Sequence, residues 1–292
     1  MVDQASKEET MQSNNPVFRN SDAFNGRGTN AYGNQTYPGN GAGFEGYGQN
    51  PTGYADPQAP VRSGERMTID SVVQKTGISL GIVVVVAAIT WFMTPEITGD
   101  PDTLGPLFAA MTIGSLAAFG LSMVNSFKRV ISPPLVIAFC VAEGVALGAL
   151  SKFFDGYFGD GIVTQAVLGT FAAFAGTLAA YKFFNIQVGQ KFRTFVIAAM
   201  FGMVALSLLE VGLSFFGNQF GLFGFGTTGL IFSILGLVLG IFMLILDFDF
   251  VEKGVAAGIE ERESWRAAFA MTVSLVWIYT NLLRILAIFS SD

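Results

Sequence analysis

Residues 228–246, TGLIFSILGLVLGIFMLIL, contain no charged side chain. A hydrocarbon core about 30 Å thick needs about 20 helical residues to cross it. Because lipid offers the backbone no hydrogen-bonding partner, such a run is typical of a transmembrane helix. Six similar apolar runs surround it, over residues 77–94, 105–125, 133–151, 162–182, 194–216 and 267–288. The sequence therefore predicts an all-α integral membrane protein, a bundle of seven transmembrane helices.

The composition excludes several classes of function. The net charge is −6, whereas a nucleic-acid-binding protein concentrates Lys and Arg on one face. Histidine is absent, which excludes His metal sites, His general bases and His pH switches. Proton sensing near neutral pH would therefore depend on carboxylates. The only cysteine, Cys140, lies inside the third helix, where we expect a small buried hydrophobe and no intrachain disulfide.

Residues 1–66 differ from the rest of the chain. Stretches such as GNQTYPGNGAGFEGYGQNPTGY (33–54) have no apolar periodicity and cannot bury a core, which predicts a disordered tail. The tail is either simply solvated, which we favour, or binds a partner through its Tyr and Gly residues. Residues 67–292 form the transmembrane domain, in which 67–76 are expected to form a short interfacial helix. No signal peptide precedes the first helix, so this helix is expected to direct insertion.

Basic residues fall almost entirely in alternate connections. One set of connections contains Arg62, Arg66, Lys75, Lys128, Arg129, Lys182, Lys191, Arg193, Lys253, Arg262 and Arg266. The other set contains only Lys152, together with Glu96, Asp100, Asp102, Asp155 and Asp160. Because positive residues remain on the cytoplasmic side, we expect a multi-pass cell-membrane protein with a cytoplasmic N-terminus and an outward-facing C-terminus.

Polar and ionisable groups within membrane helices are costly, and each ionisable group is by default a candidate for function. The candidates here are Glu143 in helix three, Glu210 in helix five, Asp247 and Asp249 at the end of helix six, and Ser274, Asn281 and Arg284 in helix seven. The structural alternative is a buried acid that hydrogen-bonds a neighbouring helix. We favour a functional over a structural role for Glu143 and Asp247, because they lie in or beside otherwise apolar segments. A functional role is less favoured for Asp249 and Glu210.

Helix geometry refines these candidates. Asp247 and Asp249 are two residues apart and point about 200° away from each other, so only one is expected to enter the bundle. Ser274 lies within the first two turns of helix seven, at a depth that Asp247 can reach. Arg284 lies near the outer end, where it is either functional or an interfacial anchor. Glycine pairs such as Gly144/Gly148 and Gly236/Gly240, and also Gly77/Gly81, would allow close helix approach.

The sequence does not indicate an enzyme. It has no nucleophile elbow, phosphate-binding loop, HExxH or CxxC motif, and it lacks the Tyr-Asp and Gly-x-Gly-Asp pattern of intramembrane aspartyl proteases. We also expect no cofactor.

Three segments together resemble the Bax inhibitor-1/YccA family, the transmembrane Bax inhibitor motif proteins. They are SPPLVIAFCVAEGVALG (132–148), ILDFDFVEKG (245–254) and the AAF…LLRIL segment (267–286). The similarity extends over about residues 67–289, and the start MQSNNPVF with its Gly/Tyr/Pro-rich tail looks like one bacterial branch. The resemblance implies a bundle in which the last helix is central. It also implies an association with pH-sensitive calcium leak, suppression of cell death in eukaryotes, or modulation of a membrane AAA protease in bacteria.

In calcium-leak members of that family, a carboxylate in helix six shares a proton with one in helix seven. The resemblance places the first on Asp247 and the second on Ser274, so this chain lacks the second acid. Glu210 or Asp249 would be substitutes, although neither matches the family position. A Ser partner supplies only a hydrogen bond, which puts the pH gate in question.

These observations lead to one main expectation and two alternatives. The main expectation is a pH-sensitive calcium or cation leak pathway in which Asp247 and Glu143 contact calcium as the permeant ion, because carboxylate oxygens suit a hard cation. The second is a non-conducting regulator that binds another membrane protein, such as a protease. A proton-coupled transporter is disfavoured, since no broken helices or inverted repeats are clear. The expected environment is a lipid bilayer, and the oligomeric state is left open, a monomer being compatible.

Overall fold

The computed structural model describes residues 65–97, 101–159, 161–184 and 186–291, with side chains from residue 104 onwards in the second segment. The tail over residues 1–64 lies outside this range, as does its expected disorder. The described residues form seven α-helices and one short 3-10 helix. Their bounds are α1 (Ile69–Met93), α2 (Pro101–Phe127), α3 (Pro133–Phe158), α4 (Ile162–Phe183), α5 (Gln190–Ser214), α6 (Thr227–Ala257), η1 (Glu261–Glu263) and α7 (Ser264–Ser290).

All seven α-helices are long and apolar enough to cross a membrane. The shortest, α4, has 22 residues. At about 1.5 Å per residue it exceeds the thickness of a typical hydrocarbon core. The chain is therefore a multi-pass membrane protein, as the sequence predicts.

Several helices extend beyond the apolar runs that predict them. α1 begins at Ile69 rather than at residue 77, because Thr68 and Ser71 form a capping box at its N-terminus. The expected interfacial helix over 67–76 is thus not separate but supplies the first turns of α1. α3 and α6 likewise continue past residues 151 and 246. Hydropathy marks where a helix leaves the hydrocarbon, whereas backbone hydrogen bonds continue into the headgroup region.

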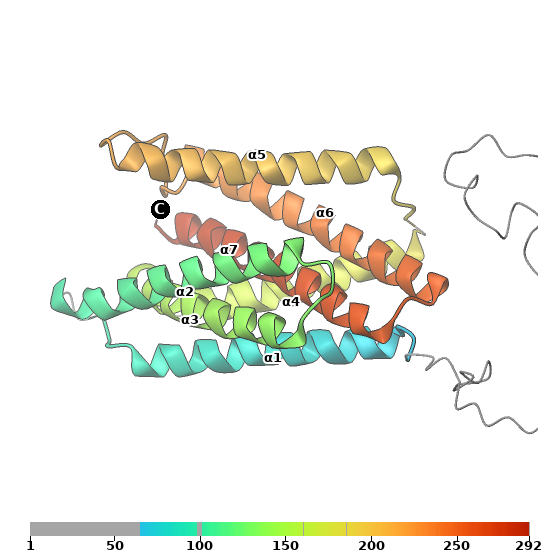
Figure 1. Cartoon of the computed structure of the whole chain (residues 1–292). Coiled ribbons are helices and arrows are strands. Elements are labelled where there is room, and N and C mark those ends of the chain that lie inside the picture. The colour runs from blue at the N-terminus through green and yellow to red at the C-terminus, as the bar shows by residue number, and fades with distance from the viewer. Residues whose placement is uncertain (1–64, 98–100, 160, 185, 292) are drawn as a thin grey trace, which may run out of the picture. The chain divides into compact units, whose positions relative to one another are not determined.

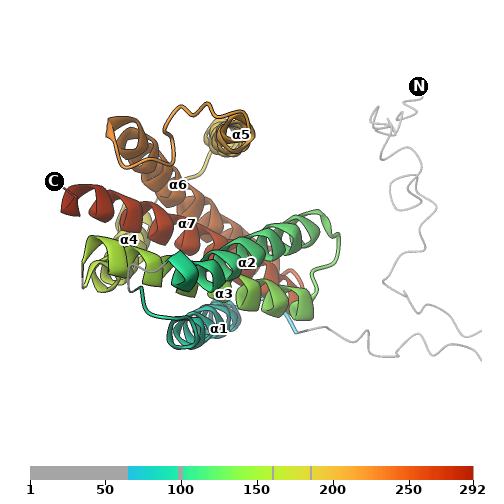
Figure 2. The same ribbon diagram turned by 90° about the vertical axis from the view of Figure 1, so that its left-hand side faces the viewer.

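The last helix lies in the middle of the bundle (Figures 1 and 2). α1, α3, α4 and α6 all pack against α7, whereas α2 packs on α3 and α5 packs on α6. Buried residues accordingly occur along the whole of α7, from Ser264 to Ile288. This arrangement confirms the central position predicted for the last helix.

Two of the three glycine pairs lie where helices approach closely. A Cβ atom on Gly144 would lie 2.7 Å from Cβ of Val86 on α1, and one on Gly240 would lie 2.7 Å from Cγ1 of Ile278 on α7. Real Cβ atoms essentially never come this close, so these backbones approach as only glycine allows. Gly77 and Gly81, by contrast, face open space.

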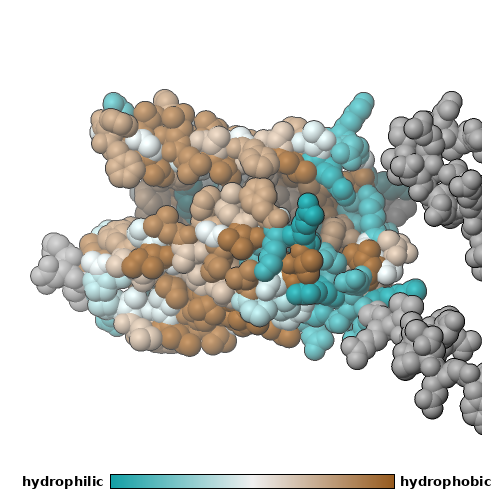
Figure 3. Space-filling view, viewed as in Figure 1, coloured by the Kyte–Doolittle hydropathy of each residue, from teal (hydrophilic) through white to brown (hydrophobic). Residues whose placement is uncertain are grey.

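The basic connections meet at one end of the bundle, which we call the basic end. The backbone N–H of Met67 donates to the Ile259 carbonyl at 2.8 Å, joining the start of α1 to the α6–α7 connection. Arg262 donates to the Ile131 carbonyl at 2.9 Å, which brings in the α2–α3 connection. In Figure 3, hydrophilic residues gather at this end and apolar residues cover the sides of the helices. The opposite end is called the acidic end and includes Glu96 and Asp155.

Candidate functional site at the interface of α6 and α7

Asp247 of α6 meets Ser274 of α7 inside the bundle. The Ser274 hydroxyl donates to Oδ2 of Asp247 at 2.6 Å. The two helices approach closely here because α6 presents Gly236 and Gly240 to α7. The indole N–H of Trp277 donates to the Gly236 carbonyl at 2.8 Å and thereby fixes the register of the two helices. No Lys or Arg of the described chain forms an ion pair with Asp247.

Asp249 has different surroundings. Its carboxylate is 3.0 Å from the Arg193 guanidinium of α5 and 2.7 Å from the Lys253 ammonium one turn along α6. The side chain is only 4% exposed, whereas both cations reach solvent. The two acids therefore point to different neighbours, as their spacing predicts. Both lie within the bundle, however, because Asp249 as a whole residue is only 3% exposed, so the expectation that only one of them enters it is wrong. Asp249 ties α5 to α6 at the basic end.

Glu143 lies on α3 and is partly buried. Among the described residues it has no hydrogen-bond or ion-pair partner, which is uncommon for a carboxyl group within an apolar span. α3 and α6 both pack on α7 and make no extensive contact with each other. The structure therefore does not bring Glu143 together with Asp247; α7 lies between the helices that carry them.

Glu210 is a buried anchor for the connection between α5 and α6. Its carboxylate accepts hydrogen bonds from the backbone N–H groups of Phe220, Gly221 and Leu222 at 2.9, 2.9 and 3.0 Å. Glu210 follows Arg193 by 17 residues, which is about 25 Å along a helix. It therefore lies near the acidic end, far from the ion pairs of Asp249, and is not in position to replace the missing partner of Asp247.

The other polar residues of α7 bind carbonyl groups. Asn281 is buried, and its amide donates to the Trp277 carbonyl of its own helix at 2.8 Å. Arg284 donates to the Leu222 carbonyl at 2.7 Å and lies over the ring of Phe223. Arg284 and Glu210 thus hold the same α5–α6 connection from two sides. The sequence suggested that Arg284 is either functional or an interfacial anchor. The structure shows in addition that it contacts the α5–α6 connection.

Several polar contacts were not predicted from the sequence. Lys253 lies four residues after Asp249, a spacing that favours an ion pair on a helix and is visible in the sequence. Two other contacts join different helices, so no local spacing in the sequence indicates them. They are the ion pair of Arg193 with Asp249 and the hydrogen bond of 2.6 Å between the Ser151 and Tyr279 hydroxyls.

No resident metal site is evident in the part of the chain that the structure describes, where no three His, Cys, Asp or Glu side chains come together. Cys140 is buried inside α3, in keeping with the position expected from the sequence.

The fold and this site define a polytopic all-α membrane protein that carries an ionisable group at the packing interface of its central helix. A family model described as Bax inhibitor 1 like matches residues 15–291, and the chain belongs to this family. A search of the curated proteins found no match. The match confirms the resemblance that the three sequence segments indicate.

Proposed function

We propose that the protein is a pH-sensitive leak pathway for calcium or a similar cation, in which the Asp247–Ser274 contact forms the gate. The observation that carries this proposal is the hydrogen bond of 2.6 Å between a carboxyl group of α6 and a hydroxyl group of the central helix. Family membership supports it, since the helix-six acid of calcium-leak members corresponds to Asp247.

The absence of a cation beside Asp247 supports a gating role. Asp249 forms ion pairs with two basic side chains, Arg193 and Lys253. Asp247 has only a hydroxyl partner among the described residues, so its protonated and ionised forms would make different contacts with α7. A change in its protonation would therefore alter the packing of α6 on α7.

Glu143 is proposed as a second acidic group for the cation, on a separate side of α7. Its carboxyl group is partly buried and has no protein partner in the described segments, so its oxygens are available to a hard cation. Because it does not contact Asp247, the two acids would act at successive points rather than form one calcium site.

Calcium flux into liposomes that contain the purified full-length protein tests the proposal. We expect flux that changes between about pH 5 and 8. Asp247→Asn should flatten the pH dependence, and Glu143→Gln should reduce the flux without altering assembly. Glu96→Gln is the matched control, because Glu96 is exposed at the acidic end and should leave both quantities unchanged.

Ser274→Asp provides a second test. It would create the carboxylate pair of calcium-leak relatives and should steepen the pH response, because two adjacent carboxylates cannot both ionise cheaply. Flux equal to that of protein-free liposomes at every pH would overturn the channel proposal.

A regulator of another membrane protein, for example a protease, is the second candidate function. α5 favours it, since among the described helices it packs mainly on α6 and presents Phe195, Phe201 and Leu208 to the exterior. A partner helix would fit this face, and the tail before α1 would extend the contact. Unchanged flux after deletion of residues 1–66 would favour the channel, whereas absent flux with co-purification of a membrane protein would favour the regulator.

We also propose the cell membrane as the location, with the basic end in the cytoplasm. The basic connections support this orientation, because all four lie at one end of the bundle. A reporter fused after Asp292 should be active only outside the cytoplasm, and cytoplasmic activity would reverse the orientation.

A further inference from the structure

A groove of about 530 Å³ runs between α1 and α4. Its sides are formed by these two helices, which make no extensive contact with each other, and its floor by α3 and α7. Val84 on one side and Phe171 on the other are 60% and 56% exposed. Both helices are membrane spans, so the open side of the groove faces the hydrocarbon of the bilayer.

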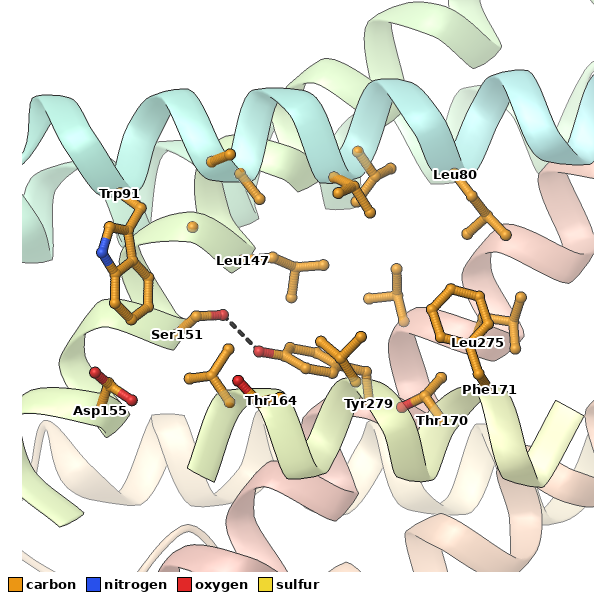
Figure 4. A pocket seen from close by; sticks show the side chains of 18 of the residues that line it. Leu80, Trp91, Leu147, Ser151, Asp155, Thr164, Thr170, Phe171, Leu275 and Tyr279 are labelled. Atoms are coloured by element: carbon orange, nitrogen blue, oxygen red, sulfur yellow. Dashed lines mark hydrogen bonds between the residues drawn. The ribbon is translucent and has the colours of Figure 1, made fainter. Parts of the chain in front are cut away.

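The length of the groove matches one leaflet. On α1 its lining extends from Leu80 to Phe92, twelve steps that correspond to about 18 Å along a helix. One leaflet contributes about half of a hydrocarbon core that is about 30 Å thick. Figure 4 shows Trp91 and Asp155 at one end of the groove and Leu80, Phe171 and Leu275 at the other. The first end belongs to the acidic end of the bundle, and the second lies near the middle of the spans.

The floor of the groove is suited to an apolar chain. The Ser151 and Tyr279 hydroxyls bind each other at 2.6 Å, as the dashed line in Figure 4 shows. On the α4 side of the groove, the Thr170 hydroxyl donates to the Ala166 carbonyl of its own helix at 2.8 Å. Since these polar groups are already satisfied, an acyl chain would not leave them without partners.

The groove also has a charged end. Asp155 is the one residue with a formal charge among the described residues that line it. Its Oδ1 accepts a weak hydrogen bond of 3.3 Å from the Gly161 N–H, which leaves most of the carboxylate available to a cationic group. Lys152, one turn earlier, donates to the Trp91 and Thr94 carbonyls and so holds the end of α1 beside this carboxylate.

We propose that the groove binds one acyl chain of an amine-bearing zwitterionic phospholipid from the leaflet at the acidic end. The chain occupies the space between α1 and α4, and the headgroup ammonium meets Asp155. An anionic phospholipid of the same chain length would bring its negative charge to the same carboxylate and is disfavoured. The proposal is independent of ion conduction, because it depends only on the groove and on the membrane position of the helices.

Native mass spectrometry of the full-length protein tests the proposal. The protein is released from mixed micelles that contain equal amounts of phosphatidylethanolamine and phosphatidylglycerol with identical acyl chains. We expect one retained phosphatidylethanolamine per chain, preferred over phosphatidylglycerol by about fivefold or more.

Two matched pairs of variants locate the lipid. Val84→Trp fills the groove and should abolish retention, whereas Val85→Trp, at an adjacent position that is 57% exposed but outside the groove, should retain the lipid. Asp155→Asn should remove the preference between the two lipids, and Glu96→Gln should preserve it. Equal retention of both lipids by the unchanged protein, equal behaviour of the two tryptophan variants, or no retained lipid at all would overturn the proposal.

Discussion

Asp247 and Asp249 lie two residues apart on the same helix, yet they have opposite surroundings. Asp249 is almost fully buried and forms ion pairs with two cations. Asp247 has a single hydroxyl partner on the central helix. The comparison separates two uses of a carboxylate in a membrane protein. A paired acid fixes one helix against another, whereas the acid without a cation is the group that we propose as the gate.

The largest effect should come from removing the cations of Asp249. Arg193→Ala combined with Lys253→Ala leaves a buried charge without a partner, which should lower the free energy of unfolding by about 3–5 kcal/mol. Denaturation in mixed micelles measures this change. The control, Lys182→Ala with Lys191→Ala, removes two exposed cations of the same end and should have little effect.

Adding Asp249→Asn to that double variant should recover part of the lost stability, because it removes the unpaired charge. A further loss instead would show that Asp249 stabilises the bundle by packing rather than through its ion pairs.

A third carboxylate, Glu210, extends the comparison, because backbone N–H groups take the place of cations. Hydrogen bonds to charged groups each contribute about 1.5–3 kcal/mol, so Glu210→Gln should destabilise the protein by about 2 kcal/mol. Limited proteolysis should show faster cleavage within residues 215–226. Unchanged cleavage would mean that Arg284 alone is sufficient to hold this connection.

The sequence predicted the surroundings of Asp247 much better than those of Asp249 and Glu210. The seven spans follow from hydropathy, which is a local property. The Asp247–Ser274 contact was predicted from the family resemblance, together with the depth of each residue along its helix. Arg193 and the loop N–H groups around Glu210 come from segments whose position depends on tertiary packing. Glu143 shows the same limit, since its depth in helix three was clear from the sequence but its separation from Asp247 by α7 was not.

A smaller effect is expected where α6 approaches α7 beside the Asp247–Ser274 contact. Gly240→Ala places a methyl group against Ile278, and such overpacking costs about 1–3 kcal/mol. The same substitution at Gly81 faces open space and should be neutral or stabilising, because alanine favours a helix by about 1 kcal/mol over glycine. Equal effects at the two positions, measured by thermal denaturation in detergent, would contradict the close α6–α7 contact.

The smallest effect on stability should come from Asp247→Asn, although this is the substitution expected to change ion flux the most. Asparagine keeps a carbonyl oxygen for the Ser274 hydroxyl and leaves no cation unpaired, so the free energy of unfolding should change by about 1 kcal/mol or less. The measurement is denaturation of the variant beside the unchanged protein in the same micelles. A loss comparable to that of the Arg193/Lys253 double variant would assign Asp247 a structural role like that of Asp249. A small loss together with a flattened pH dependence of flux would separate the gating acid from the structural one.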